Sequence, residues 1–366
     1  MSSVRVGING RVLAKPDSGG VGRYTERLLS EFTEQREASS NCSVVAVGSA
    51  TASTVPDGIE SVGRIPDHSG LRAHIWEQIQ LPLELRSHDF DVFHTPAGQP
   101  PVLTATPLVT TIHDISPITH PEWFSDAYAA LYRLLTPLAI RTSERIITVS
   151  EFAREEIIST YPSAKGKTTA ILNGVTPRDP SAAIPCDDLT PDGFLLFVGS
   201  INPRKNIRRL LKAYKQYREK TDQPYPLVLV GPNNDIFAAT DLPNIDGVSR
   251  LGFVSEAKLT WLYDNAALFV FPSLYEGFGL PILEAMSVGT PTLTSDCGAM
   301  SEVAGDAAHL VDPTDVDAIA SGIEHVLDDP EKRHNLSQRG KQRATTFSWE
   351  RTAKQTAIVY EEVAES

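Results

Sequence analysis

Short runs of aliphatic and β-branched residues alternate along the chain with longer segments whose apolar positions recur at helical spacing. Strands are predicted at 4–9, 43–47, 91–94, 108–112, 145–149, 169–172, 194–198, 227–230, 268–271 and 292–294. Helices are predicted between them at 21–37, 121–143, 151–160, 203–219, 256–266 and 281–288, and helices fill most of the chain after 316. This alternation is typical of parallel βα units, so both halves of the chain are predicted to be α/β.

One stretch interrupts the alternation. From Thr176 to Gly193 the chain reads TPRDPSAAIPCDDLTPDG, and its prolines and aspartates suit neither a helix nor a strand. We interpret 177–193 as a linker between a Rossmann-like domain at 1–176 and a second one at 194–348, with the last helix, 349–366, returning to the first domain. In open parallel sheets, ligands bind beyond the carboxyl ends of the strands, so the loops at these ends are the candidate site.

Composition and charge exclude several classes of protein. The 366 residues are 41% hydrophobic and 22% charged, which is enough for two ordinary cores. A net charge of -13 argues against nucleic acid as the main partner. The three cysteines are far apart and form no CxxC pair, which favours a reducing compartment over a disulfide framework or a zinc site. The start has no apolar signal region and no run is long enough to span a bilayer. We therefore expect a cytoplasmic protein, with peripheral membrane contact left open.

The first candidate loop is SGGVGRY, Ser18 to Tyr24, between the first strand and the first helix. Gly19 and Gly20 let backbone amides approach a ligand, and the N-terminus of the following helix favours an anion. The loop is not GxGxxG, so dinucleotide binding is disfavoured. A flexible turn is the alternative interpretation.

The second candidate loop is SINPRKN, Ser200 to Asn206, directly after Gly199 at the end of a strand. Asn202 is a good N-cap and Pro203 suits the first position of a helix. Arg204 and Lys205 are then predicted in the first helical turn, where cations oppose the helix dipole. An anionic ligand such as a diphosphate would remove this conflict. A solvated basic face is the alternative.

The third candidate loop is YEGFGLPILE, Tyr275 to Glu284. Its two glycines make an open loop, and a helix is predicted to begin at Pro281. The carboxylates of Glu276 and Glu284 can accept hydrogen bonds from sugar hydroxyls, as ribose is usually held. The amides from Phe278 to Leu280 could meet a phosphate or sugar oxygen. Alternatively, Glu284 complements the helix dipole and Glu276 is an exposed loop acid.

Two histidines, His113 and His94, end predicted strands. Each could be a core histidine with satisfied hydrogen bonds, and His113 is the stronger functional candidate. Asp89 and Asp91 match the DxD pattern that can hold a divalent ion, but they precede a strand instead of following it. The histidines have no metal-ligand spacing, so no required metal is predicted.

Taken together, these motifs resemble the retaining family 4 glycosyltransferases, and the resemblance runs nearly end to end. Besides the three loops, it is carried by DVFHTPA (Asp91–Ala97), TIHD (Thr111–Asp114), HPEWF (His120–Phe124), RIITVSEFAREEI (Arg145–Ile157), ILNGV (Ile171–Val175) and LGFVSEAKL (Leu251–Leu259). The resemblance implies the GT-B fold, with two facing Rossmann-like domains and an interdomain cleft. Within the family the chain is most similar to bacterial mannosyltransferases of surface-polysaccharide assembly.

The resemblance also implies residue roles. Arg204 and Lys205 would neutralise the donor diphosphate, Glu284 would bind the donor ribose and Glu276 would contact the transferred sugar. His113 would lie beside the reacting sugar. The other implied donor-binding residues are Gly19, Gly20, Gly199, Val254, Phe278, Gly279 and Leu280.

The predicted function is transfer of a hexose, by retention, from a nucleotide diphosphate sugar to a saccharide or lipid-linked saccharide. GDP-mannose is the favoured donor and a UDP-hexose the second; no further cofactor is expected. One alternative is a GT-B epimerase, which needs an acid–base set around the sugar ring. Another is a non-catalytic sugar-nucleotide-binding protein, which would not need the complete set of Lys205 and Glu276.

Overall fold

The computed structural model describes residues 3–14, 19–35, 41–48, 55–63, 71–186, 188–232 and 242–366. The chain divides into two compact units. Unit 1 comprises Met1–Ile115, Ala130–Gly174 and Ser348–Ser366, and unit 2 comprises Ser116–Ala129 and Val175–Phe347. The segment Ser116–Ala129 thus belongs to unit 2, although its position in the sequence puts it inside the first predicted domain.

Unit 1 is built on a parallel sheet whose strand order is β3-β2-β1-β4-β5-β6-β7. Its strands are β1 (Val4–Asn9), β2 (Cys42–Val47), β3 (Glu60–Val62), β4 (Val92–Thr95), β5 (Leu108–Thr111), β6 (Arg145–Thr148) and β7 (Thr168–Ala170). Its helices include α1 (Gly19–Gln35), α2 (Leu71–Ile75), the π-helix η2 (Trp76–Gln80), α3 (Leu81–Arg86), α6 (Glu151–Thr160) and α13 (Trp349–Ala364).

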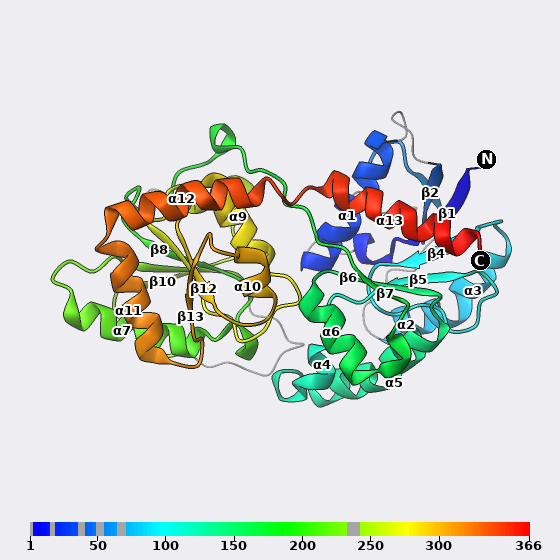
Figure 1. Ribbon diagram of the computed structural model, residues 1–366, viewed down its shortest axis with the longest axis horizontal. Helices are drawn as coiled ribbons and strands as arrows, with labels where there is room; N and C mark the ends of the chain where they lie inside the picture. Colours follow the sequence, from blue (N-terminus) through cyan, green and yellow to red (C-terminus); the bar gives the residue numbers. More distant parts are fainter. Residues whose placement is uncertain are drawn as a thin grey trace. The chain divides into compact units, whose positions relative to one another are not determined.

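Helices cover both faces of the first sheet. On one face α1 and α13 lie side by side, so the last helix of the chain closes the core of the first unit (Figure 1). Val6 and Ile8 of β1 point into this core, where Tyr24 and Tyr360 are fully buried. On the other face Trp76, with the helices around it, covers a second apolar cluster. The period-two alternation of a strand serves both clusters at β4, where Val92 lies in the first and Phe93 in the second.

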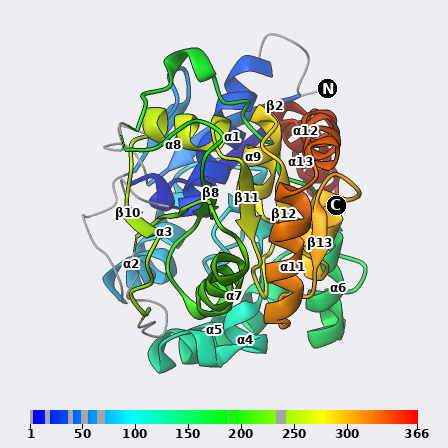
Figure 2. The ribbon, with the colours of Figure 1, turned by 90° about the vertical axis from the view of Figure 1, so that its left-hand side faces the viewer.

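Unit 2 is built on a second parallel sheet, with the order β10-β9-β8-β11-β12-β13. Its strands are β8 (Leu195–Val198), β9 (Leu227–Val230), β10 (Val248–Gly252), β11 (Leu268–Phe271), β12 (Thr292–Ser295) and β13 (His309–Val311). The helices are α4 (Ser116–Thr119), α7 (Ile207–Lys220), α8 (Glu256–Asp264), α9 (Leu280–Val288), α10 (Gly298–Ala304), α11 (Val316–Leu327) and α12 (Pro330–Ala344). Figure 2 shows α8, α9 and α12 on one face of this sheet and α7 and α11 on the other.

These two parallel sheets confirm the predicted α/β class, and β1, β9 and β11 have the predicted bounds. Two helix predictions are wrong. The segment predicted as one helix at 121–143 contains a 3₁₀ turn at Pro121–Trp123, an extended Phe124 and only then α5 (Asp126–Thr142). The helix predicted at 203–219 is a 3₁₀ turn, Pro203–Lys205, followed by α7. Among the described residues, no helix is both long and apolar enough to cross a bilayer.

Candidate functional site

The two central strands of unit 2 bring the second and third candidate loops together. The strand order reverses between β8 and β11, and a ligand crevice in an open α/β sheet forms at such a switch point. The loops that follow these strands are joined directly, since the Leu274 amide donates to the Arg204 carbonyl at 2.7 Å. Gly231 allows the end of β9 to approach the same place: a Cβ there would lie 2.1 Å from the Gly199 carbonyl oxygen.

Asn206 separates the basic turn from the helix behind it. It has a left-handed backbone (φ 59°), and its Nδ2 donates to the carbonyls of Pro272 (2.9 Å) and Pro313 (2.6 Å). Asn202 caps the turn by accepting from the Lys205 amide at 3.3 Å, as predicted. Because α7 begins only at Ile207, the predicted conflict between the two cations and the dipole of that helix is wrong.

The two cations of the turn instead share one carboxylate. Lys205 Nζ lies 2.6 Å from Glu276 Oε1, and Arg204 Nη1 lies 3.3 Å from Glu276 Oε2. The side chains of Lys205 and Glu276 are 7% and 8% exposed, whereas that of Arg204 is 18% exposed. Glu276 is therefore no exposed loop acid, and the alternative of a solvated basic face fails for Lys205.

Burial and charge act in opposite directions on Glu276. Burial raises the pKa of a carboxyl, but the Coulomb attraction of Lys205, followed by that of Arg204, outweighs it and holds the pKa of Glu276 below its usual value. The Lys205 ammonium also lies 4.5 Å from the centre of the Phe271 ring. Gly199 passes close to the same side chain, since a Cβ at Gly199 would be 3.3 Å from Lys205 Cε.

Glu284 lies on α9, among a different set of partners. Tyr263 donates its hydroxyl to Glu284 Oε2 at 2.9 Å, and Arg178 Nη2 lies 3.2 Å from Glu284 Oε1. The Arg178 guanidinium stacks over the Tyr263 ring at 4.8 Å. These contacts hold the carboxylate at one place, so its role is more than complementing a helix dipole.

The predicted amide donors lie at the start of α9. Gly279 is its N-cap with φ 103°. The helix begins at Leu280, one residue before the predicted start, so Pro281 is its second residue. Only glycine adopts this φ readily, which explains the GFGLP pattern. Phe278 is buried and packs edge-on against Phe347, with ring centroids 5.9 Å apart. Val254 is partly buried in the loop between the edge strand β10 and α8.

The first candidate loop belongs to unit 1, and its glycines are part of α1. Gly19 has φ 60°, and a Cβ added at Gly19 or Gly20 would meet no atom of the described residues within 4 Å. The backbone there is exposed and sterically open. Ser18 of this loop lies outside the described residues.

His113 follows β5 in unit 1. Its Nε2 donates to the Pro96 carbonyl at 2.9 Å, and its ring lies edge-on to Tyr24 with centroids 4.9 Å apart. Burial lowers the pKa of His113, against smaller opposite effects of the Pro96 bond and Asp114. His113 is thus a neutral imidazole with the proton on Nε2 and an acceptor at Nδ1.

His94 and Asp91, the second aspartate of the DxD pattern, have structural partners. Both ring nitrogens of His94 are engaged inside the core, with Tyr360 at 2.6 Å and Thr111 at 2.8 Å. Burial lowers the pKa of His94 to about 3. Asp91 accepts the Arg5 amide at 2.7 Å. Within the described ranges, no three His, Cys, Asp or Glu side chains gather as metal ligands would.

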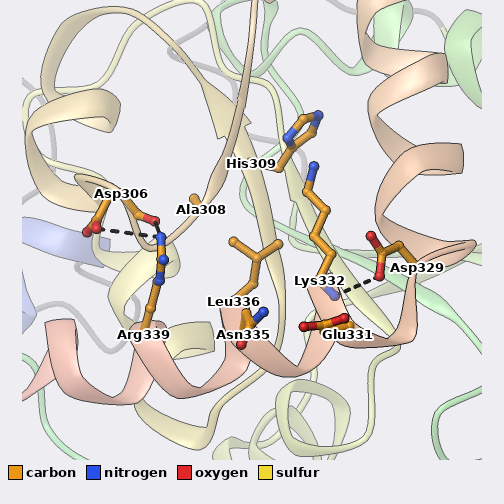
Figure 3. A pocket seen from close by; sticks show the side chains of 9 residues that line it. All are labelled: Asp306, Ala308, His309, Asp329, Glu331, Lys332, Asn335, Leu336 and Arg339. Atoms are coloured by element: carbon orange, nitrogen blue, oxygen red, sulfur yellow. Dashed lines mark hydrogen bonds and ion pairs between the residues drawn. The ribbon is translucent and has the colours of Figure 1, made fainter.

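A pocket of about 370 Å³ lies at the opposite end of the second sheet, where β13 begins (Figure 3). Arg339 pairs there with Asp306 at 3.6 Å, Asp329 accepts the backbone amide of Lys332 at 2.9 Å, and the Lys332 ammonium extends toward His309 (Figure 3). Burial, then Lys332, lowers the pKa of His309 to about 4. Since ligands bind at the carboxyl ends of parallel strands, we do not place the functional site here.

The sequence analysis missed three residues of the site: Asn206, Tyr263 and Arg178. Asn206 had a local signal, because asparagine tolerates the left-handed conformation. Tyr263 lies on a helix and Arg178 in the stretch predicted as a linker, and neither carries a motif that would identify it.

Comparison with known families finds two matches. The model described as Glycosyltransferase Family 4 matches residues 18–179, and the model described as Glycosyl transferases group 1 matches residues 189–343. O-antigen chain mannosyltransferase B of Escherichia coli is 39% identical over 264 residues, which are 69% of each chain. An MMP alpha-(1->4)-mannosyltransferase of Mycolicibacterium hassiacum is 30% identical over 274 residues, covering 70% of this chain and 65% of that protein.

Solved structures share the whole fold at low identity. A sucrose-phosphate synthase from Thermosynechococcus elongatus is 21% identical and aligns with a TM-score of 0.73 over 99% of this chain and 100% of its own. WaaG, a glycosyltransferase involved in lipopolysaccharide biosynthesis, is 18% identical with a TM-score of 0.69, over 97% and 99% of the two chains. Both are GT-B proteins, which confirms the predicted fold class.

Proposed function

Because the chain belongs to glycosyltransferase family 4, we propose that it transfers a hexose, with retention of configuration, from a nucleotide diphosphate sugar to a saccharide or lipid-linked saccharide. The observation that carries this proposal is the buried group of Lys205, Arg204 and Glu276 at the carboxyl ends of β8 and β11. A sugar-nucleotide epimerase or a binding protein is disfavoured, since the matched relatives are named as transferases.

Arg204 and Lys205 bind the donor diphosphate in this proposal. Two cations in the loop share one carboxylate, and the longer, more exposed Arg204 contact is the one that exchanges most easily for a phosphate oxygen. As the bond between the sugar and the diphosphate breaks, negative charge grows on the leaving group. Cations already fixed in a largely water-excluded loop stabilise that charge without reorganising.

The two carboxylates near these cations bind different sugars of the donor. Glu276 is held next to the diphosphate cations and contacts hydroxyls of the transferred hexose. Glu284 receives the ribose hydroxyls. The amides of Phe278, Gly279 and Leu280, at the N-terminus of α9, donate to donor oxygens, and the backbone near Val254 lines the base pocket.

Unit 1 contributes two further contacts to the proposal. Gly20, with Gly19, lets the start of α1 approach the donor phosphates because no Cβ intervenes. His113 accepts a hydrogen bond from a sugar hydroxyl through Nδ1. The lowered pKa of His113 makes this acceptor role a better fit than general-base catalysis.

Attack occurs from the face that the diphosphate leaves. The acceptor hydroxyl forms the new glycosidic bond to the anomeric carbon as the bond to the diphosphate breaks, and its proton passes to the departing phosphate oxygen. Configuration is retained without a covalent enzyme intermediate. Positioning and charge stabilisation supply the catalysis, with Arg204 and Lys205 doing what a divalent metal does in other transferases.

GDP-mannose is the proposed donor and mannose the transferred sugar, with a UDP-hexose as the second choice of donor. Support comes from the two relatives above, both named as mannosyltransferases. The proposal is tested by thermal stabilisation with GDP, UDP, ADP and their sugars, with and without EDTA. A ligand at about 100 times its dissociation constant adds roughly 2.7 kcal/mol. Nucleotides of one base should stabilise the protein more than those of the other bases, with or without EDTA. Stabilisation by none of them would count against the donor site.

A lipid-linked acceptor at the cytoplasmic membrane face is the finer proposal. Ile75, Ile79 and Leu83 recur every four residues along α2, η2 and α3, and they are 48%, 60% and 58% exposed. An apolar stripe of this kind suits the interface of a bilayer. Wild-type protein should sediment with phosphatidylglycerol vesicles, and the variant with Ile79→Ser and Leu83→Ser should not. Equal sedimentation of both would contradict membrane contact through this stripe.

A further inference from the structure

Arg178 lies in the stretch predicted as a linker, yet its guanidinium is almost completely buried in unit 2. Its side chain is 7% exposed. Besides its contact with Glu284, its Nη1 donates to Thr260 Oγ1 at 3.1 Å and to Glu256 Oε2 at 3.2 Å. It stacks over Tyr263 as well. One side chain therefore ties the segment that follows Val175 to both α8 and α9.

Arg178, Tyr263 and Glu284 form a closed triangle. Arg178 binds one oxygen of the Glu284 carboxylate and Tyr263 binds the other, while the Arg178 guanidinium rests on the face of the Tyr263 ring. The hydrogen bond from Tyr263 to one oxygen and the ion pair with Arg178 at the other together restrain the place and the orientation of the carboxylate. A carboxylate on a flexible side chain gains this orientation only from such partners.

Anchoring the chain to unit 2 does not by itself explain an arginine here. The Glu256 side chain in this ion pair is 69% exposed, and ion pairs with such an exposed partner add little stability. Arg178 Nε is buried and, among the described residues, has no hydrogen-bond partner. An apolar side chain would anchor the segment without an unmet N–H. The charged head is explained by its contact with Glu284.

We propose that Arg178 is a positioning residue that orients Glu284 toward the ribose hydroxyls of the donor, and so sets the preference for ribonucleotides. This inference rests on the proposed function, in which Glu284 binds the ribose. Arg178 does not touch the nucleotide itself. Its removal therefore weakens the recognition of the ribose hydroxyls and leaves the rest of the donor contacts in place.

The experiment compares the dissociation constants of GDP and 2′,3′-dideoxy-GDP by calorimetric titration, with the matching UDP pair in parallel. The full-length wild type is compared with Glu284→Gln, Arg178→Met and Arg178→Lys. Arg343→Lys is the matched control, because Arg343 also stacks on an aromatic ring (Phe347, 4.9 Å) and binds two carbonyls, but it does not contact Glu284.

Wild type should prefer the ribonucleotide about tenfold or more, since hydrogen bonds to a charged group are strong. Glu284→Gln and Arg178→Met should both lose most of this preference, and Arg178→Lys should lose part of it, because a point charge does not hold a carboxylate in one plane. Arg343→Lys should keep it. General destabilisation weakens both ligands alike and leaves their ratio unchanged.

Two failures are distinguishable. If Glu284→Gln loses the preference but Arg178→Met keeps it, the inference about Arg178 is overturned and the role of Glu284 stands. If wild type shows no preference, or Glu284→Gln retains it, the ribose role of Glu284 fails as well. If Arg178→Met does not fold, Arg178→Lys is used in its place. An unchanged preference of that variant for the ribonucleotide over the dideoxynucleotide overturns the inference.

Discussion

The two sheets have the same strand order around their first strand, but the buried charges beside that strand differ. In unit 1, Arg11 follows β1 and pairs with Glu77 at 2.7 Å, and Asn9 donates to the same oxygen at 3.2 Å. Glu77 is fully buried. In unit 2, Lys205 and Arg204 follow β8 and share the carboxylate of Glu276.

This difference separates a structural charge group from a candidate functional one. In unit 1, Arg11 and the imidazole of His74 (Nδ1 3.2 Å from Oε2) both contact Glu77, an acid that has no contact with solvent, so these contacts hold the π-helix Trp76–Gln80 to the end of β1. In unit 2, a lysine and an arginine, both permanent cations, face one acid whose side chain is 8% exposed, an arrangement that suits an incoming anion. The same topology therefore yields a packing contact in one unit and a candidate diphosphate site in the other.

Glu77→Gln should give the largest effect on stability. Removing one member of a buried ion pair costs about 3–5 kcal/mol, because Arg11 is left without its counter-charge. Urea denaturation measures the loss, and calorimetric titration of the folded variant with GDP should give the wild-type dissociation constant. Lost GDP affinity with unchanged stability would reverse the assignment of the two charge groups.

Lys205→Met should have the largest effect on catalysis. Methionine keeps much of the packing against Phe271 but removes the charge, and loss of one fixed electrostatic stabiliser lowers a rate by about 10²–10³-fold. The rate of hexose transfer at saturating donor measures it. The double variant with Glu276→Gln is the control, because it removes the unbalanced carboxylate; recovery of the full rate there would contradict a direct role for Lys205.

The ion pairs of Glu276 should have a smaller effect, a pH dependence of the free energy of unfolding. Since its pKa is lowered in the folded protein, its ion pairs stabilise the fold fully above the unfolded value, and this stabilisation is lost as the pH falls through the folded value. The free energy of unfolding should therefore drop more steeply below about pH 4.5 in wild type than in Glu276→Gln. Equal slopes in urea denaturations from pH 6 to 3 would contradict the ion pairing.

His113→Phe should have the smallest effect. The variant keeps a ring beside Tyr24 but cannot accept a hydrogen bond, so the transfer rate should fall about tenfold. Because the pKa of His113 is lowered, the profile of kcat/KM against pH should have the same shape in both proteins between pH 6 and 8. A wild-type limb near pH 6.5 that the variant lacks would identify His113 as a general base instead.

Local pattern predicted most strands and the three candidate loops. Hydrophobic runs such as 227–230 and 268–271 end where the structure ends β9 and β11, because buried parallel strands are continuous apolar segments. The basic turn was predicted as helix because NPRKN carries a good N-cap and proline; the left-handed Asn206 that ends the turn is stabilised by carbonyls from distant loops. Rules based on neighbouring residues cannot predict these partners, because they lie far away in the sequence.

The site shows the same limit. Local motifs made Arg204, Lys205, Glu276 and Glu284 candidates, but the pairing of Lys205 with Glu276 joins residues 71 positions apart. Arg178 lies in a proline-rich stretch and Glu77 in a helix without a motif. Long-range pairs of single charges leave no periodic signal in a sequence, so only the fold identifies them.

The central claim is that the basic turn after β8 binds the donor diphosphate. Calorimetric titration of wild type and Lys205→Met with GDP and GMP, and with UDP and UMP, tests it most directly. Wild type should bind the diphosphate of the preferred base at least about tenfold more tightly than the monophosphate, as expected for charged hydrogen bonds, and Lys205→Met, which keeps Arg204, should lose most of that preference. A variant that keeps the full preference for the diphosphate would contradict the account.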